Sequence, residues 1–199
     1  VAGVAVLLTI PALWAMIQGA PKETAVRAVQ VWPIRDVLPE ESEKAVPDGV
    51  TRCSNGYVYC EDIPLTNGRQ CAAQMYCLQY DVDYCLFLGL IECESAFDPE
   101  ADNGVSLGYC QINRLNFGWL QNAGIDPETP LGNLEAGALI LGDLLTRHDT
   151  DHALMAYNCG ETGAAELWEQ GYDTSPYSRE VCAAGARWRE RLGLEADNE

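Results

Sequence analysis

The chain from Pro64 onward repeats apolar residues at the spacing of helices. Apolar positions that recur every three or four residues predict amphipathic helices. This pattern predicts helices at about 64–79, 82–95, 111–123, 131–147, 151–158, 161–170 and 175–191. Just before them, the turn sequence Ser54-Asn55-Gly56 followed by Tyr57-Val58-Tyr59 predicts a small β-hairpin within residues 51–63. The pattern therefore predicts a mainly α domain at 64–192, preceded by a hairpin.

The first 50 residues have a different pattern. Residues 1–17 are apolar and uncharged, and Pro11 interrupts them. This length is at the short end for a membrane span, so residues 1–20 are interpreted as a membrane anchor or a secretory signal. The anchor is preferred because no clear cleavage site follows, and an N-terminal core helix is the remaining alternative. Residues 21–50 are polar and rich in Pro and Glu, which is typical of a linker. We therefore expect an extracytoplasmic protein, secreted or attached to a membrane through its N-terminal segment.

Charge limits the partners that the domain can bind. The formal net charge is −18, and the chain from Thr51 onward has eight Arg, no Lys and 24 Asp or Glu, a net charge of −16. Binding to nucleic acid or to an anionic membrane surface requires a basic patch. The composition therefore argues against both kinds of partner.

The nine cysteines indicate no redox or zinc motif, because no C-x-x-C sequence is present. Cys53 and Cys60 flank the predicted turn, so a disulfide could close the hairpin. Cysteines in apolar helical positions usually act as small buried side chains. Burial is expected for Cys85, Cys93, Cys110 and Cys159.

Two carboxyls near the end of the helix at 82–95 are candidates for acid–base chemistry. Glu92 and Glu94 are two residues apart, so they project from nearly opposite sides of the helix. Apolar surroundings could raise the pKa of either carboxyl, as a general acid near neutral pH requires. Periodicity does not choose between them, and either could also be a partly solvated residue at the helix end.

Two other motifs suggest different chemistry. Gly104-Val-Ser-Leu-Gly108 matches the G-x-S-x-G pattern of serine hydrolases, which requires a preceding strand, a following helix and a nearby His. Residues 98–103 do not resemble a strand, and His148 and His152 lie at a polar junction between helices, so this interpretation is disfavoured. The two histidines could bind a metal if helical, but surface positions at helix ends explain them better. We therefore predict no metal and no cofactor.

Four sequence blocks resemble the lytic transglycosylase domain of the soluble, goose-lysozyme-like type. The stretch Glu94-Ser-Ala-Phe-Asp-Pro99 is similar to its E-S-x-F-(N/D)-P signature, and residues 106–113 to its G-L-M-Q-I block. Ala156-Tyr-Asn-Cys-Gly160 resembles the A-Y-N-x-G block, and Asn133-Leu-Glu-Ala-Gly137 a helix that packs behind the site. The resemblance covers about 65–190. It implies a lysozyme-like fold of the α+β lysozyme superfamily with a single catalytic domain.

The resemblance also assigns roles to individual residues. It makes Glu94 the catalytic residue and Ser95 a residue that fixes the helix end. It places substrate-binding residues in the cleft, where Ser106 and Gln111 would bond the substrate or Glu94, Tyr157 would reach the acid or the sugar, Asn158 would bond within the cleft, and Tyr177 would close one side. Purely structural roles in packing and backbone hydrogen bonding are the alternative for Ser106, Tyr157, Asn158 and Tyr177. The chain departs from the family at Tyr109-Cys110, where Leu-Met is usual, and at Cys159, where Ala is frequent.

The expected substrate is the glycan strand of peptidoglycan. Most glycosidases use two carboxylates, but Asp98, Glu100 and Asp102 match no second catalytic position of the family. The same Glu94 would then protonate the glycosidic oxygen and later accept a proton from a hydroxyl. Attack by the sugar's own hydroxyl gives a 1,6-anhydroMurNAc end, whereas attack by water would make the protein a muramidase. A non-catalytic peptidoglycan-binding scaffold protein is the remaining alternative.

Overall fold

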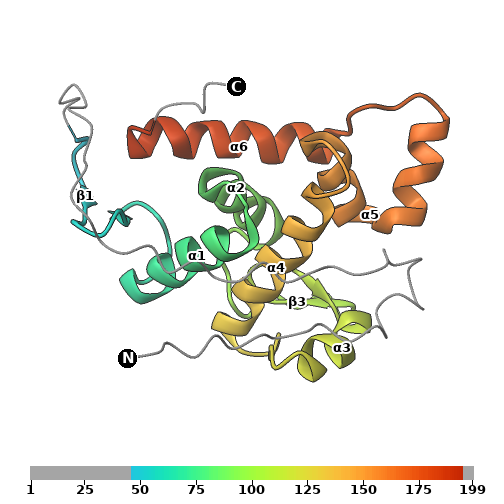
Figure 1. The fold of residues 1–199 in the computed structure, drawn as a ribbon, viewed down its shortest axis with the longest axis horizontal. Coiled ribbons are helices and arrows are strands. Elements are labelled where there is room, and N and C mark those ends of the chain that lie inside the picture. The colour runs from blue at the N-terminus through green and yellow to red at the C-terminus, as the bar shows by residue number, and fades with distance from the viewer. Residues whose placement is uncertain (1–45, 195–199) are drawn as a thin grey trace, which may run out of the picture. The chain divides into compact units, whose positions relative to one another are not determined.

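The computed structural model describes residues 46–194, and Figure 1 shows their arrangement. The predicted anchor or signal at 1–20 and nearly all of the predicted linker lie outside the described residues. Within the described part, no helix is long and apolar enough to span a membrane.

The predicted hairpin is present and is attached to the first helix. Strand β1 (Val50–Arg52) pairs antiparallel with β2 (Val58–Cys60), with Val50 opposite Cys60. The outer edge of β2 pairs with side chains: the amide of Gln74 bonds both backbone groups of Val58, and the amide of Gln70 bonds both of Cys60. Glutamines four residues apart on a helix thus replace a third strand, because every backbone group of β2 requires a partner.

The rest of the described chain is mainly helical. The helices are α1 (Asn67–Tyr80), α2 (Tyr84–Ser95), α3 (Phe117–Asn122), α4 (Pro130–Leu145), α5 (Thr150–Glu169) and α6 (Pro176–Leu192). Gly160 has a non-helical conformation (φ 74°, ψ 158°) and divides α5 into two segments. These segments match the two helices predicted at 151–158 and 161–170.

The helix predicted at 111–123 is wrong over its first half. A second hairpin occupies this region, with β3 (Ser106–Leu107) antiparallel to β4 (Ile112–Asn113), and a short 3₁₀ helix, η2 (Arg114–Asn116), follows before α3. Gln111 is left-handed (φ 45°), so a helix cannot pass through it. The Asn113 side chain accepts the N–H of Leu115 and starts the 3₁₀ turn instead.

Helix α2 lies in the centre of the core, where Phe87, Leu88, Leu90 and Ile91 are fully buried. Helix α6 lies across it (Figure 1). The two helices meet at glycines: a Cβ added to Gly89 would be 2.5 Å from the carbonyl oxygen of Val181 and 2.6 Å from the nitrogen of Gly185. This close crossing brings the start of α6 near the end of α2.

All nine cysteines are free, so the predicted Cys53–Cys60 disulfide is wrong. In the observed register Cys60 pairs with Val50, whereas Cys53 bonds Tyr57 at the other end of the ladder. Their separation is therefore too large for the Cα distance that a disulfide allows. Burial is confirmed for Cys85 and Cys110 but is wrong for Cys93, which is half-buried, and for Cys159, which the break at Gly160 leaves exposed.

Candidate active site

Glu94 lies in the last turn of α2, where the chain changes direction sharply. Ala96 and Phe97 both have positive φ, 50° and 64°, and they end the helix directly after Ser95. The buried Phe97 ring packs edge-on against Trp188 of α6, with ring centroids 5.7 Å apart. The Ser95 hydroxyl lies within hydrogen-bond distance of two carbonyl oxygens, Ile91 at 3.2 Å and Tyr109 at 2.8 Å. Ser95 thus ties the helix end to the next loop, as the resemblance implied.

Glu92 and Glu94 have different hydrogen-bond partners in the structure. Glu92 accepts hydrogen bonds from Trp188 Nε1 at 2.7 Å and from Arg187 at 2.8 Å, so an aromatic N–H and a guanidinium hold its carboxylate. The half-buried Glu94 has one hydrogen-bond donor, the hydroxyl of Tyr177. Burial raises the pKa of Glu94, and the bond from Tyr177 offsets part of that rise. Of these two glutamates, Glu94 is therefore the one whose hydrogen-bond partner among the described residues is a single neutral hydroxyl.

Two tyrosines predicted for the site come from different helices. Tyr177 lies in the first turn of α6 and contacts the acid directly. Tyr157 of α5 instead donates its hydroxyl to the carbonyl oxygen of Cys110 at 2.9 Å. Burial, with a smaller effect from the Glu94 charge, raises the pKa of both tyrosines, so both hydroxyls remain protonated donors.

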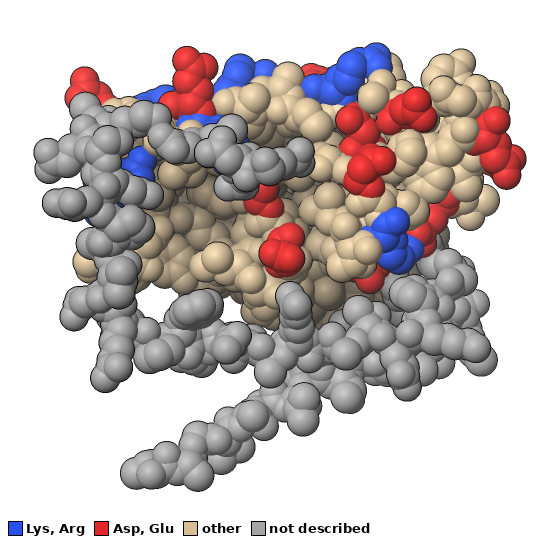
Figure 2. All heavy atoms as spheres, turned by 45° about the horizontal axis from the view of Figure 1, so that its top comes forward, with Lys and Arg blue, Asp and Glu red and all other residues tan. Residues whose placement is uncertain are grey.

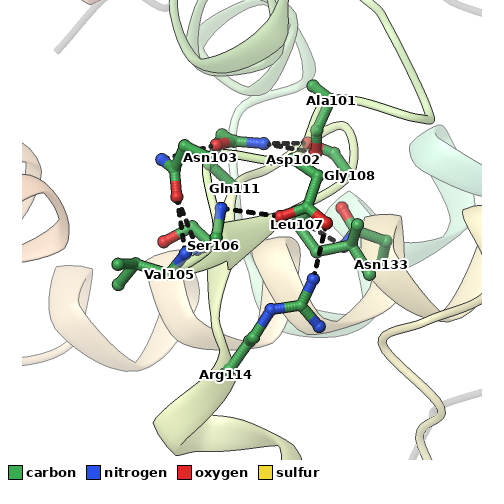
Figure 3. A network of polar contacts seen from close by, with 11 residues as sticks. Ala101, Asp102, Asn103, Val105, Ser106, Leu107, Gly108, Gln111, Arg114 and Asn133 are labelled. Carbon is green, nitrogen blue, oxygen red and sulfur yellow. Dashed lines mark hydrogen bonds and ion pairs between the residues drawn. The ribbon is translucent and has the colours of Figure 1, made fainter.

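Gln111 organises the loop beside the site, as Figure 3 shows. Its side-chain N–H groups donate to the carbonyl oxygens of Ala101 (2.9 Å) and Gly108 (3.0 Å), and its oxygen accepts from Asn103 at 3.1 Å. Asn103 in turn accepts the backbone N–H of Ser106 at 2.7 Å. The amide of Gln111 is therefore occupied within the loop, and of its two predicted partners, the substrate or Glu94, it does not bond Glu94.

Asn133 of α4 also holds this loop through hydrogen bonds. Its side-chain oxygen accepts the N–H of Cys110 at 2.9 Å, and its amide donates to Leu107 at 2.8 Å and Pro127 at 3.0 Å. It is only 1% exposed. The sequence indicated packing behind the site but not this role; a buried Asn in an otherwise apolar helix was the available signal.

The departures from the family pattern at Tyr109 and Cys110 have local explanations. The hydroxyl of Tyr109 accepts a hydrogen bond from Arg69 of α1 at 2.7 Å. The small side chain of Cys110 packs against Gly137, where an added Cβ would be 2.4 Å from its sulfur. Both residues fit the interior of this chain, and both lie next to the loop that Asn133 holds.

Ser106 and Asn158 are less closely tied to the acid. Ser106 is half-buried in β3, and its hydroxyl makes no hydrogen bond to any of the described residues. Asn158 is exposed, and within the same part of the chain its side chain also makes none. The structure thus joins Tyr177 directly to Glu94 and bonds Tyr157 of α5 to the adjoining loop that Gln111 holds. It gives Ser106 and Asn158 no side-chain hydrogen-bond partner among residues 46–194.

The serine-hydrolase and metal interpretations have no support in this geometry. Ser106 begins a two-residue strand that turns into another strand, rather than a strand followed by a helix. His148 and His152 both pack against Trp168, with ring centroids 4.9 and 4.8 Å from it. The groups beside them are Asp149 and Glu161, and Ser106 is not among their partners.

The charged surface is mainly acidic. Five of the eight arginines form ion pairs with nearby carboxylates, among them Arg114–Asp102, Arg189–Asp83 and Arg191–Asp62. Figure 2 shows acidic side chains across one face, with the few basic ones close to them. The arginines are thus largely neutralised where they stand.

Comparison with known proteins agrees with the fold. The family model described as "Transglycosylase SLT domain" matches residues 72–178, more than half of the chain. Among solved structures, an inactive variant of lytic transglycosylase Slt from Pseudomonas aeruginosa superposes with a TM-score of 0.56 at 16% sequence identity. The match covers 67% of this chain and 25% of that one, so this chain spans part of the neighbour's length. No curated protein sequence matches.

These findings confirm the predicted mainly α, lysozyme-like fold with its small hairpin. They also confirm the resemblance from which Glu94 was selected. The chain belongs to the transglycosylase SLT domain family.

Proposed function

We propose that the protein is a peptidoglycan lytic transglycosylase that cleaves the β-1,4 bond between MurNAc and GlcNAc. Glu94 is its single catalytic acid and base, and the products carry 1,6-anhydroMurNAc ends. The observation that carries the proposal is the environment of Glu94, a half-buried carboxyl with a raised pKa and one tyrosine hydroxyl as its hydrogen-bond partner. A raised pKa makes a carboxyl better able to hold a proton and then release it, as a general acid and base must.

The reaction uses the Glu94 carboxyl twice, first as an acid and then as a base. Protonated Glu94 gives its proton to the glycosidic oxygen, the bond from C1 of MurNAc to that oxygen breaks, and GlcNAc leaves as an alcohol. The N-acetyl group of MurNAc stabilises the cationic centre at C1. The ionised Glu94 then takes the proton from the C6 hydroxyl as its oxygen bonds to C1, which restores the acid without consuming water.

The environments of the three carboxylates that follow Glu94 favour the proposal that Glu94 acts as the single acid and base. Asp98, Glu100 and Asp102 are exposed in the loop after α2. Asp98 accepts the N–H of Glu100 at 2.9 Å, and Asp102 accepts the N–H of Gly104 and pairs with Arg114, both at 2.8 Å. The carboxylates of Asp98 and Asp102 hold the loop, and Glu100 is exposed within it, so all three are poor candidates for a second catalytic group. The Pseudomonas neighbour, whose inactive variant has Gln in place of one Glu, is consistent with an essential glutamate.

We assign substrate contacts to Ser106, Gln111, Tyr157, Asn158 and Tyr177. Ser106 and Asn158 have side chains without hydrogen-bond partners, which leaves their polar groups available to a sugar. Gln111 acts mainly through the loop that it holds. The proposed reaction takes place outside the cytoplasm, where peptidoglycan lies, with residues 1–20 as anchor or signal.

Digestion of purified peptidoglycan by the full chain tests the proposal, with mass analysis of the soluble products. We expect muropeptides that end in 1,6-anhydroMurNAc. Reducing MurNAc ends, which are 18 Da heavier because water has been added, would identify a muramidase instead. Binding without release of soluble products would identify a scaffold protein and would contradict catalysis.

A further inference from the structure

The position of the Tyr177 hydroxyl depends on how the first turn of α6 is held. Ser175 caps this helix: its hydroxyl accepts the N–H of Ser178, while the Ser178 hydroxyl accepts the N–H of Ser175, both at 3.0 Å. Tyr177 lies inside this reciprocal pair, one residue before Ser178. The pair fixes the turn within α6 but does not by itself fix the turn relative to the rest of the domain.

A bond to a second helix supplies that connection. The Ser178 hydroxyl donates its hydrogen to Asp151 Oδ1 at 2.6 Å, and Asp151 is in the first turn of α5. Ser178 is 0% exposed, so water does not compete for its hydroxyl. A hydrogen bond to a carboxylate in such a place is short and strong. The bond from Ser178 to Asp151 therefore joins the start of α6 to the start of α5.

We propose that Asp151 is a positioning residue for Glu94: through Ser178 it holds the first turn of α6 so that the Tyr177 hydroxyl points at the Glu94 carboxyl. The chain of contacts is continuous from Asp151 to Ser178, across one peptide bond to Tyr177, and from the Tyr177 hydroxyl to Glu94. Asp151 touches neither the acid nor a sugar. Its kinetic role rests on the proposed function, whereas its effect on Glu94 does not.

The consequence is a dependence of the pKa of Glu94 on Asp151. The groups that face Glu94 are Tyr177 on α6, Tyr157 on α5, Cys110 on the loop and Cys93 on α2 itself. Burial raises the pKa of each of the four, so all are neutral near pH 7 and none supplies a charge to Glu94. The bond from Tyr177 favours the ionised carboxyl. If the first turn of α6 shifts, this bond weakens and the pKa of Glu94 rises.

The test measures the ionisation of Glu94 itself. The full chain is labelled with ¹³C at the glutamate carboxyls, and Glu94 is titrated by NMR in the wild type and in variants. Tyr177→Phe removes the bond directly, Asp151→Ala removes the tether, and Asp151→Asn retains a side-chain oxygen that accepts from Ser178. Arg179→Ala is the matched control, because Arg179 is exposed in the same turn and its side chain, within the described part of the chain, bonds Thr174 alone.

We expect the pKa of Glu94 to rise in Tyr177→Phe and in Asp151→Ala, and to stay near the wild-type value in Asp151→Asn and Arg179→Ala. If Asp151→Ala does not fold, Ser178→Ala removes the same bond together with the cap bond from the Ser175 N–H, and the pKa of Glu94 is expected to rise there as well. A wild-type titration of Glu94 in Asp151→Ala or Ser178→Ala would overturn the proposal. An equal rise in Arg179→Ala would also overturn it, because any disturbance of the turn would then suffice.

Turnover on soluble glycan strands tests the kinetic part. Misplacement of a catalytic contact lowers kcat by about tenfold to a hundredfold, so we expect such a loss in Asp151→Ala with KM nearly unchanged and recovery in Asp151→Asn. A wild-type kcat in Asp151→Ala would overturn this part. If the wild type released no product, the proposed function would fail, while the titration would still decide whether Asp151 positions Tyr177.

Discussion

Two glutamates at the end of α2 have different partners although they are two residues apart. Glu92 is bound by Arg187 and Trp188 of α6, and Glu94 faces buried groups and Tyr177. Helical geometry places them on opposite sides, but it does not show what lies on each side. The sequence pattern could not distinguish them, because the distinguishing partners come from residues more than 80 positions away.

The difference in stability between Glu94→Gln and the wild type should depend on pH. Because burial raises the pKa of Glu94, the folded chain binds this proton more tightly than the unfolded chain. The resulting stabilisation is present at low pH and is lost as the pH rises through the folded pKa. Gln has no such loss, so the variant should melt at a higher temperature than the wild type at about pH 7, with the difference vanishing near about pH 4. A lower melting temperature at neutral pH would show that the fold stabilises the charge.

Asn133→Ala should destabilise the protein strongly. It removes the partners of the Cys110 N–H and of the Leu107 and Pro127 carbonyl oxygens, and unmet buried groups cost about 1–3 kcal/mol each. We expect a loss of about 3 kcal/mol in the free energy of unfolding by urea denaturation. Asn158→Ala is the matched control, since that side chain is exposed and makes no hydrogen bond. Equal losses in both variants would contradict the support that we assign to Asn133.

At the scale of elements, the crossing of α2 and α6 forms the site. The two helices approach closely at Gly89 and Gly185, and this contact allows Tyr177 at the start of α6 to reach Glu94 at the end of α2. Each helix alone carries half of the acid–tyrosine pair. The spacing of the two helices is therefore as important to the site as its side chains.

Gly89→Ala tests that spacing. Its methyl group would meet the backbone of α6 at 2.5 and 2.6 Å, so the helices must separate, and overpacking of this kind costs about 1–3 kcal/mol. Gly68→Ala, on the open face of α1, adds the same methyl group where nothing lies within 4 Å and should stabilise by about 0.5 kcal/mol. Chemical denaturation measures both variants. A neutral Gly89→Ala would mean that the crossing is not tight.

The elements also show how far the sequence predicts this fold. Helices α1, α2, α4 and α6 were predicted to within a few residues, because their apolar positions recur at helical spacing. The hairpin at β3 and β4 was missed, since strands of two residues have no periodicity to detect. Gln111, at the start of the segment predicted as a helix, has a left-handed backbone conformation and is held by hydrogen bonds to Ala101 and Gly108. The spacing of apolar residues carries no information about these bonds.

For the site, the sequence provided candidates and the family resemblance provided roles. Together they identified Glu94 and Tyr177 but not their direct contact, and they assigned Gln111 to the substrate or the acid rather than to the loop that its amide holds. Asn133 and Asp151 act through other residues. A side chain of this kind is recognised only when its partners are placed in space.

At the scale of the whole molecule, acidic charge dominates. From Thr51 onward, 24 Asp or Glu face eight Arg, and five of the arginines are already ion-paired. Most carboxylates in the described part of the chain therefore have no arginine beside them. The mutual repulsion of these carboxylates opposes the compact folded state. A surface of this kind is not expected to bind nucleic acid.

Added salt should therefore stabilise the protein. Screening weakens repulsion between exposed charges at separations beyond a Debye length. We expect the melting temperature to rise by about 2–4 °C, equivalent to about 1 kcal/mol, between low salt and about 0.5 M NaCl. A fall with salt would show that the ion pairs outweigh the repulsion. Sucrose at equal osmolality controls for general solvent exclusion.

The measurement that tests the central claim most directly compares two substitutions in the full chain. Glu94→Gln and Glu92→Gln make the same chemical change two residues apart, and each is assayed for release of muropeptides from purified peptidoglycan. We expect Glu94→Gln to lose at least about a thousandfold in rate while it remains folded, because the proposed reaction has no second acid. Glu92→Gln should retain most activity. Release by Glu94→Gln at the wild-type rate, or loss of activity in Glu92→Gln alone, would contradict the assignment of Glu94 as the catalytic residue.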